Sequence, residues 1–151
     1  MKKTLLFSLC LVAGYISMAQ SDKMVKWNYT VKKIGEKTYE IQMIADIERD
    51  YHMYAQNVGV DGPVPTSFTF TKSPELIFDG KIKEQGKLIK KYESAWNGNA
   101  NYYERNVIFI QVVKLKHDLK TNLKGKVEFM VCDDKKCLLP SNVDINVSVG
   151  G

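Results

Sequence analysis

The fold is decided by residues 38–48, which read T-Y-E-I-Q-M-I-A-D-I-E. Apolar side chains occupy every second position of this stretch, and most of the residues between them are polar. A period of two predicts a β-strand with one buried face. Residues 27–32 alternate in the same way, and Gly35-Glu36-Lys37 has the composition of a turn. The two stretches are therefore predicted to form a β-hairpin.

Strand patterns continue to the end of the sequence. We predict further strands at residues 67–71, 75–78, 106–116, 126–132 and 143–149. Residues 107–110 are apolar at every position, which predicts a central strand buried on both faces. No window of 12 residues has a helical stripe of apolar side chains. The longest irregular stretches are predicted at 56–65 and 92–102, and long loops on a β scaffold are where function usually lies.

These patterns predict an all-β chain. Seven or eight short strands, separated by turns and without crossover helices, indicate an immunoglobulin-like antiparallel β-sandwich. A closed barrel is the alternative. The 151 residues, of which 44% are hydrophobic and 26% charged, have an ordinary globular composition. We therefore expect one domain, covering residues 20–151.

The first 19 residues have the pattern of a secretory signal peptide. Lys2 and Lys3 precede an apolar run at 5–16, and small residues at 17–19 indicate cleavage after Ala19. The apolar run is too short to cross a bilayer, which takes about 20 residues, so we expect no membrane span after cleavage. Lipid attachment at Cys10 is disfavoured because the bulky Leu9 precedes it. The predicted location is the periplasm.

The charge of the mature chain argues against nucleic acid as a partner. Loss of residues 1–19 removes two of the 22 basic residues and none of the 17 acidic ones, which leaves a net charge of +3. The basic residues are scattered, whereas nucleic-acid binding calls for a clustered basic stripe.

Cys132 and Cys137 are the two cysteines of the predicted mature chain. The alternation of Val127, Phe129 and Val131 toward the core places Cys132 on the opposite face, outside the central core. A charged loop at 133–136 then leads to Cys137. This geometry can bring the two Cα atoms within the disulfide range of about 4.4 to 6.8 Å. An exported protein permits such a bond.

A disulfide here can be structural or redox active, and both readings stay open. Closing a loop of six residues stabilises a fold by only about 2.2 kcal/mol before strain is subtracted. A short bond near the surface belongs to the reducible class. A plain staple is nevertheless the commonest role in small exported domains. Zinc is disfavoured because His52 and His117, the two histidines, are isolated from each other, and we expect no metal.

The charges around the pair favour one sulfur as the nucleophile. Lys135 and Lys136 precede Cys137 and should stabilise its thiolate. Asp133 and Asp134 follow Cys132 and should disfavour ionisation there. We therefore expect Cys137 to be the nucleophile and Cys132 to be the resolving thiol.

Three segments together resemble a known family: Y-H-M-Y at 51–54, G-P-V-P-T-S-F at 62–68, and residues 125–140 with the cysteine pair and the following Pro140. The sequence from Trp27 to Val149 resembles the N-terminal periplasmic domain of the thiol:disulfide interchange protein DsbD. The resemblance implies an immunoglobulin-like domain, without a cofactor, that relays electrons from a thioredoxin-like donor to exported partners. Those partners would include disulfide isomerases and the thioredoxins of cytochrome c biogenesis.

The resemblance also implies roles for single residues. The second cysteine of the family forms the mixed disulfide, which agrees with the choice of Cys137. A cap loop with an aromatic residue shields the pair, and Trp96 in the segment 93–103 stands at the matching place. Tyr54 and His52 match an aromatic pair beside the cysteines, with His52 at a position that the family fills with tyrosine.

Two departures from the family shape the expected function. The loop between the cysteines is one residue shorter than in the best-known members, and the family's transmembrane conduit and thioredoxin-like domain have no counterpart in this sequence. We therefore expect electrons to arrive from a separate protein, by protein-disulfide reductase or interchange activity. The alternative is a non-enzymatic immunoglobulin-like module that binds protein or glycan and has a structural disulfide.

Overall fold

The computed structural model describes residues 21–151, so the predicted signal peptide and Cys10 lie outside the described residues. Eleven strands follow a short 3-10 helix, η1 (Ser21–Met24). They are β1 (Val25–Gly35), β2 (Thr38–Ile47), β3 (His52–Tyr54), β4 (Ser67–Phe70), β5 (Leu76–Gln85), β6 (Ile89–Glu93), β7 (Gly98–Glu104), β8 (Asn106–Leu115), β9 (Thr121–Phe129), β10 (Val131–Cys132) and β11 (Ser141–Val149). No helix among these residues is long and apolar enough to cross a membrane.

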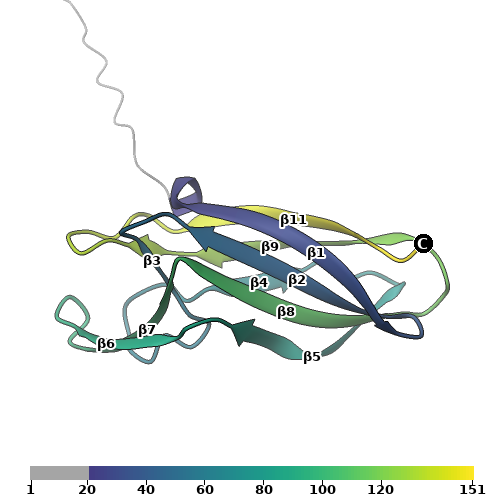
Figure 1. The fold of residues 1–151 in the computed structure, drawn as a ribbon, viewed down its shortest axis with the longest axis horizontal. Coiled ribbons are helices and arrows are strands. Elements are labelled where there is room, and N and C mark those ends of the chain that lie inside the picture. The colour runs from purple at the N-terminus through teal and green to yellow at the C-terminus, as the bar shows by residue number, and fades with distance from the viewer. Residues whose placement is uncertain (1–20) are drawn as a thin grey trace, which may run out of the picture.

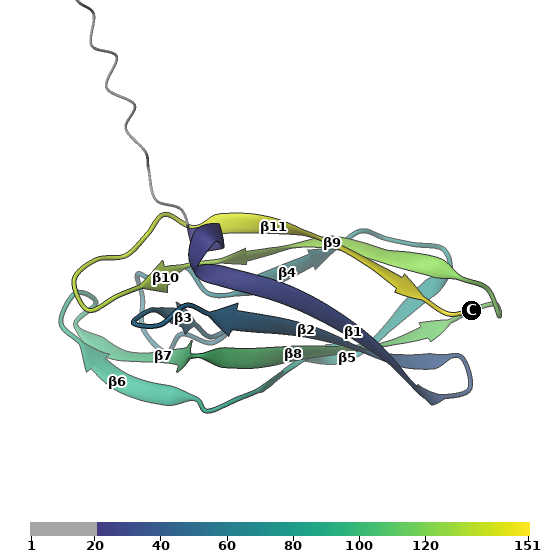
Figure 2. The same ribbon diagram turned by 45° about the horizontal axis from the view of Figure 1, so that its top comes forward.

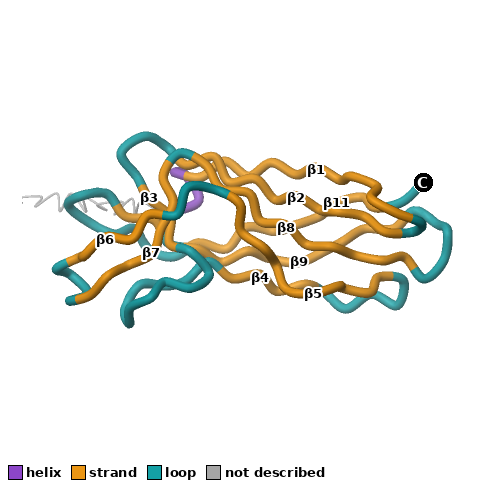
Figure 3. Tube along the Cα trace, turned by 60° about the horizontal axis from the view of Figure 1, so that its bottom comes forward, coloured by secondary structure: helices purple, strands orange, loops and turns teal. Residues whose placement is uncertain are grey.

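The strands form an immunoglobulin-like β-sandwich, as predicted (Figure 1). One sheet has the order β1-β2-β8-β5 and the facing sheet has the order β11-β9-β4. A third, smaller sheet with the order β10-β3-β7-β6 lies at one end of the sandwich (Figures 2 and 3). All pairings are antiparallel.

The alternating segments build the central core. In β2 the predicted apolar face is buried and the predicted polar face is exposed or half-buried. Trp27 of β1 packs against Phe109 of β8 and, across the sandwich, against Phe129 of β9, with ring centroids 5.9 and 5.5 Å apart. The two sheets therefore meet over an apolar interior built from side chains of both.

Some predicted details were wrong. Residues 92–102 are not a loop, because β6 and β7 pair there as a hairpin around a turn at 94–97. Asn97 adopts φ 51° in that turn, a left-handed conformation that asparagine tolerates better than most residues. The second face of β8 is only half-buried, at Ile108 and Ile110. β5 is also longer than the predicted strand at 75–78.

The predicted strand at 126–132 is interrupted at Met130, and this interruption creates a second core. Val127, Phe129 and Val131 pack in the central core, as predicted. Met130 and Cys132 instead belong to a separate cluster under the third sheet, together with Tyr54, Val58, Ala100 and Tyr102. The prediction that Cys132 lies outside the central core is confirmed. The third sheet thus has its own apolar support.

Candidate functional site

The two cysteines close a short loop at the end of β10. Cys132 and Cys137 are bridged as an isolated antiparallel pair and form a disulfide, with Cα atoms 4.0 Å apart, slightly closer than the expected range. Asp133 shapes the loop, since its Oδ1 accepts hydrogen bonds from the backbone N–H groups of Lys135 and Lys136, both at 2.7 Å. These hydrogen bonds hold the pKa of Asp133 below its usual range. The loop therefore contains its own turn.

The two sides of the disulfide differ in exposure. Cys132 is 2% exposed and packs in the second core, whereas Cys137 is exposed. A thiolate that attacks a disulfide approaches in line with the S–S bond, and it reaches the attacked sulfur from the end away from the other sulfur. The structure therefore leaves Cys137 as the more exposed cysteine of the pair.

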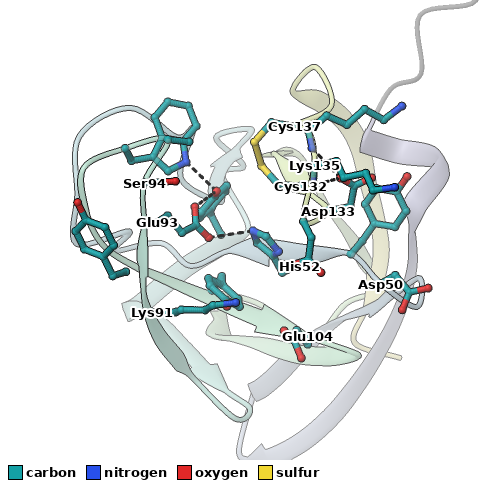
Figure 4. A pocket seen from close by; sticks show the side chains of 18 of the residues that line it. Asp50, His52, Lys91, Glu93, Ser94, Glu104, Cys132, Asp133, Lys135 and Cys137 are labelled. Atoms are coloured by element: carbon teal, nitrogen blue, oxygen red, sulfur yellow. Dashed lines mark hydrogen bonds and ion pairs between the residues drawn. A yellow bond between two sulfur atoms is a disulfide. The ribbon is translucent and has the colours of Figure 1, made fainter.

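A cavity of about 690 Å³ lies beside the disulfide. Its lining includes every site residue that the sequence singled out: His52, Tyr54, Trp96, Cys132, Lys135, Lys136 and Cys137. Figure 4 shows the disulfide on one side of this space and Glu93 and Ser94 of the β6–β7 hairpin on the other. Residues from four separate segments thus converge on one site.

A polar network connects the hairpin to β3. The indole N–H of Trp96 donates to the Tyr54 hydroxyl at 3.0 Å, and that hydroxyl donates to Glu93 Oε2 at 2.8 Å. Tyr54 is completely buried. Burial, and then the hydrogen bond to Glu93, raise its pKa well above the ordinary value, so the hydroxyl stays protonated as a donor.

Glu93 is the site residue that the sequence did not reveal. It joins Tyr54 through one oxygen, and its other oxygen lies 3.3 Å from His52 Nε2. Its side chain is 16% exposed. A single glutamate at the start of the predicted cap segment carries no signal of such a role, since its two partners lie about 40 positions earlier in the chain.

His52 is the direct neighbour of Cys132 on the adjacent strand of the third sheet. The two residues are register partners in the β10–β3 pair. The His52 ring stacks on Tyr102, with centroids 4.2 Å apart, and meets the Tyr54 ring edge-on at 5.4 Å. Burial lowers the pKa of His52 below its ordinary value, although Glu93, Glu104 and Asp134 act in the opposite direction. The resting imidazole is therefore neutral at pH 7.

The loop at 56–65, confirmed as irregular, supports Trp96 from behind. Gly62 has φ 128°, and a Cβ at this position would collide with the Trp96 ring. The same loop is held to β7 by Asn101, whose backbone N–H donates to Val58 O at 2.7 Å. The Gly-Pro segment of the sequence therefore provides the space that the indole occupies.

Lys135 and Lys136 are exposed and line the cavity. Neither forms an ion pair with a side chain of residues 21–151. Within the same residues, no group of three histidine, cysteine or acidic side chains is arranged to hold a metal ion.

Ser21 fastens the start of the described chain to both flanks of the disulfide loop. It is completely buried; its hydroxyl donates to Leu139 O at 2.7 Å and accepts from Val131 N–H at 3.2 Å. We expect Ser21→Ala to lower the free energy of unfolding by about 1–3 kcal/mol, because Val131 N–H is left buried without a partner. Urea unfolding measures this, with the exposed Ser148→Ala as a control within about 0.5 kcal/mol of wild type. Equal stability of the two variants would contradict the role of Ser21.

Comparison with known proteins gives two kinds of match. The family model described as "Thiol:disulfide interchange protein DsbD, N-terminal" matches residues 20–148. The fold is similar to the N-terminal periplasmic domain of ScsB from Proteus mirabilis, with TM-score 0.60, 16% identity and coverage of 82% of this chain and 46% of that one. This chain thus spans less than half of the ScsB structure.

A second solved structure with a similar fold is the reduced N-terminal domain of DsbD from Neisseria meningitidis. Its TM-score is 0.57 at 12% identity, with coverage of 89% of this chain and 92% of that one. At these identities the two structures show the shared fold. No match was found among curated protein sequences.

Proposed function

Because this chain belongs to the family of N-terminal domains of the thiol:disulfide interchange protein DsbD, we propose that it is an exported thiol:disulfide exchange domain whose reactive bond is Cys132–Cys137. The observation that carries the proposal is the asymmetry of this bond, which has one buried and one exposed cysteine at the edge of a cavity. A disulfide that only held the fold would need neither an exposed cysteine nor an adjoining polar cavity.

The proposed exchange has two steps. A partner thiolate attacks Cys137, the Cys132–Cys137 bond breaks, and Cys132 receives the electron pair and a proton. A second thiol of the partner then attacks the partner sulfur of the mixed disulfide, so that the partner leaves as a disulfide and Cys137 is released as a thiolate. Alternatively, Cys132 attacks Cys137, restores the Cys132–Cys137 bond and releases the partner as a thiolate. Electrons pass only between sulfur atoms, so the reaction uses no cofactor.

The partners are proposed from the family. We infer thioredoxin-like proteins as donors and disulfide isomerases or thioredoxins of cytochrome c biogenesis as acceptors, with the periplasm as the location. The N-terminal signal pattern supports export. The ScsB domain of similar fold is described as periplasmic.

Trp96, Lys135 and Lys136 are proposed to adjust the reactivity of the pair. The bulk of Trp96, on the hairpin that lines the cavity opposite the disulfide, would restrict access of small oxidants. The two lysines would lower the pKa of the Cys137 thiol by favouring its thiolate. Their exposure means that salt screens this effect.

The reduction potential tests this function. Equilibration of the protein with glutathione or dithiothreitol buffers is expected to give a potential above about −300 mV, since structural disulfides usually lie below that value. Reduction should also lower the free energy of unfolding by no more than about 2.2 kcal/mol, which is the contribution of the chain entropy that closing a six-residue loop removes from the unfolded state. A much lower potential, or unfolding on reduction, would favour the binding module with a structural disulfide.

A further inference from the structure

The position of His52 suggests a chemical role in the second half of the exchange. The residue is the direct cross-strand partner of Cys132. Side chains at directly opposed positions have Cβ atoms only about 4.5–5.5 Å apart and lie on the same face of the sheet. To resolve a mixed disulfide on Cys137, the Cys132 thiol must lose its proton. It must do so while almost completely buried. Burial raises the pKa of a thiol, so Cys132 needs a base nearby.

The surroundings of His52 fit that need. Its Nε2 lies 3.3 Å from Glu93 Oε1, without the alignment of a hydrogen bond. In the tautomer with the proton on Nε2, toward Glu93, the Nδ1 lone pair is free to accept another proton. The carboxylate would then stabilise the imidazolium that forms. A nucleophile, a base and an acidic residue that supports the base are the elements of an activated thiol.

We propose that His52 is the general base that removes the proton from Cys132 when Cys132 resolves a mixed disulfide on Cys137. This inference rests on the proposed exchange function. The proton passes from Cys132 Sγ to His52, and Cys132 Sγ bonds to Cys137 Sγ. The bond between Cys137 and the partner sulfur breaks, and the partner leaves as a thiolate with the electron pair. The cysteine pair is oxidised and the partner is reduced. In the reverse direction the His52 imidazolium returns the proton to Cys132.

Several groups face His52 and set the pH range of this step. β6 contributes Glu93 and Lys91, and β7 contributes Glu104 and Tyr102. Asp134 of the cysteine loop also acts on the imidazole, and Tyr54 of β3 meets the ring edge. Burial outweighs the three carboxylates and holds the pKa of His52 below its ordinary value. The base is thus unprotonated at neutral pH, where it can act.

A two-phase reaction with 5,5′-dithiobis(2-nitrobenzoic acid) tests the proposal on the reduced protein. Attack by Cys137 releases one thionitrobenzoate and leaves a second on the protein, which Cys132 then displaces. For the wild type we expect the second-phase rate to rise with pH and to level off above the pKa of His52. In His52→Gln the second phase at pH 7 should slow by about 10²-fold, the lower end for loss of a general base. Its rate should continue to rise with pH toward the pKa of the Cys132 thiol.

Controls separate this proposal from folding and from the exchange function. His117→Gln removes an exposed histidine that pairs with Glu75 at 2.7 Å, and it should leave both phases unchanged. Glu93→Gln retains His52 but removes its carboxylate, so the midpoint of the second-phase profile should move to lower pH and its plateau should fall. Wild-type second-phase kinetics in both His52→Gln and Glu93→Gln would overturn the role of His52. Absence of the first phase in Cys132→Ala would instead overturn Cys137 as the reactive thiol.

Discussion

Cys137→Ser is expected to reduce thiol exchange to the background rate, a loss of more than about 10³-fold, the scale on which removal of a nucleophile is felt. Serine cannot form a mixed disulfide. Cys132 cannot substitute, since it is 2% exposed and packs among the side chains of the second core. Formation of a mixed disulfide between the reduced protein and oxidised glutathione, followed by mass spectrometry, measures the rate.

Cys132→Ala is the matched variant. It leaves the exposed Cys137 free to attack or be attacked but removes the thiol that would resolve the product. The expected result is a stable mixed disulfide on Cys137 with glutathione or with a thioredoxin-like protein. If Cys132 in the Cys137→Ser variant formed adducts as fast as Cys137 does in Cys132→Ala, the assignment of the two roles would be wrong.

The sequence predicted the sandwich because most of its long strands bury a single face. Residues 38–48 and 143–149 alternate visibly between apolar and polar side chains. β7 gives no such signal, because Tyr102 faces the second core while the adjacent Tyr103 faces the central core. A strand that supports two cores loses its period of two. The sequence therefore predicts a loop where β7 forms.

The candidate site was predictable where a residue has a distinctive chemical type. The cysteine pair follows from its chemical type and spacing, whereas Trp96, His52 and Tyr54 follow from the family resemblance, and all five residues line one cavity. Glu93 was missed because its position depends on contacts formed only after folding, with a hydrogen-bond partner 39 positions away. The register of His52 with Cys132 was also hidden, since it depends on the strand break at Met130.

Phe129 and Met130, which are adjacent at the break between β9 and β10, allow a test of the two-core arrangement. Phe129 is completely buried in the central core and packs against Trp27. We expect Phe129→Ala to lower the free energy of unfolding by about 3–5 kcal/mol, because it removes a large side chain from a closed interior. Urea unfolding measures this loss. Below the unfolding transition the rate at which dithiothreitol reduces the disulfide should stay close to wild type, since the second core is unchanged.

Met130→Ala should lower the stability less than Phe129→Ala does, and it should increase the rate of disulfide reduction more. Met130 packs in the second core with Cys132 and Tyr54, and that core is bordered by partly buried side chains such as Trp96. The loss of stability should lie near the lower end of the range for Met→Ala, about 2 kcal/mol, because an open border lets the site relax. The disulfide should be reduced faster than in wild type, since Cys132 loses packing on one side. If both variants changed stability and reduction rate in the same proportion, the two cores would be one cooperative unit, and the third sheet would not be a separate support for the redox site.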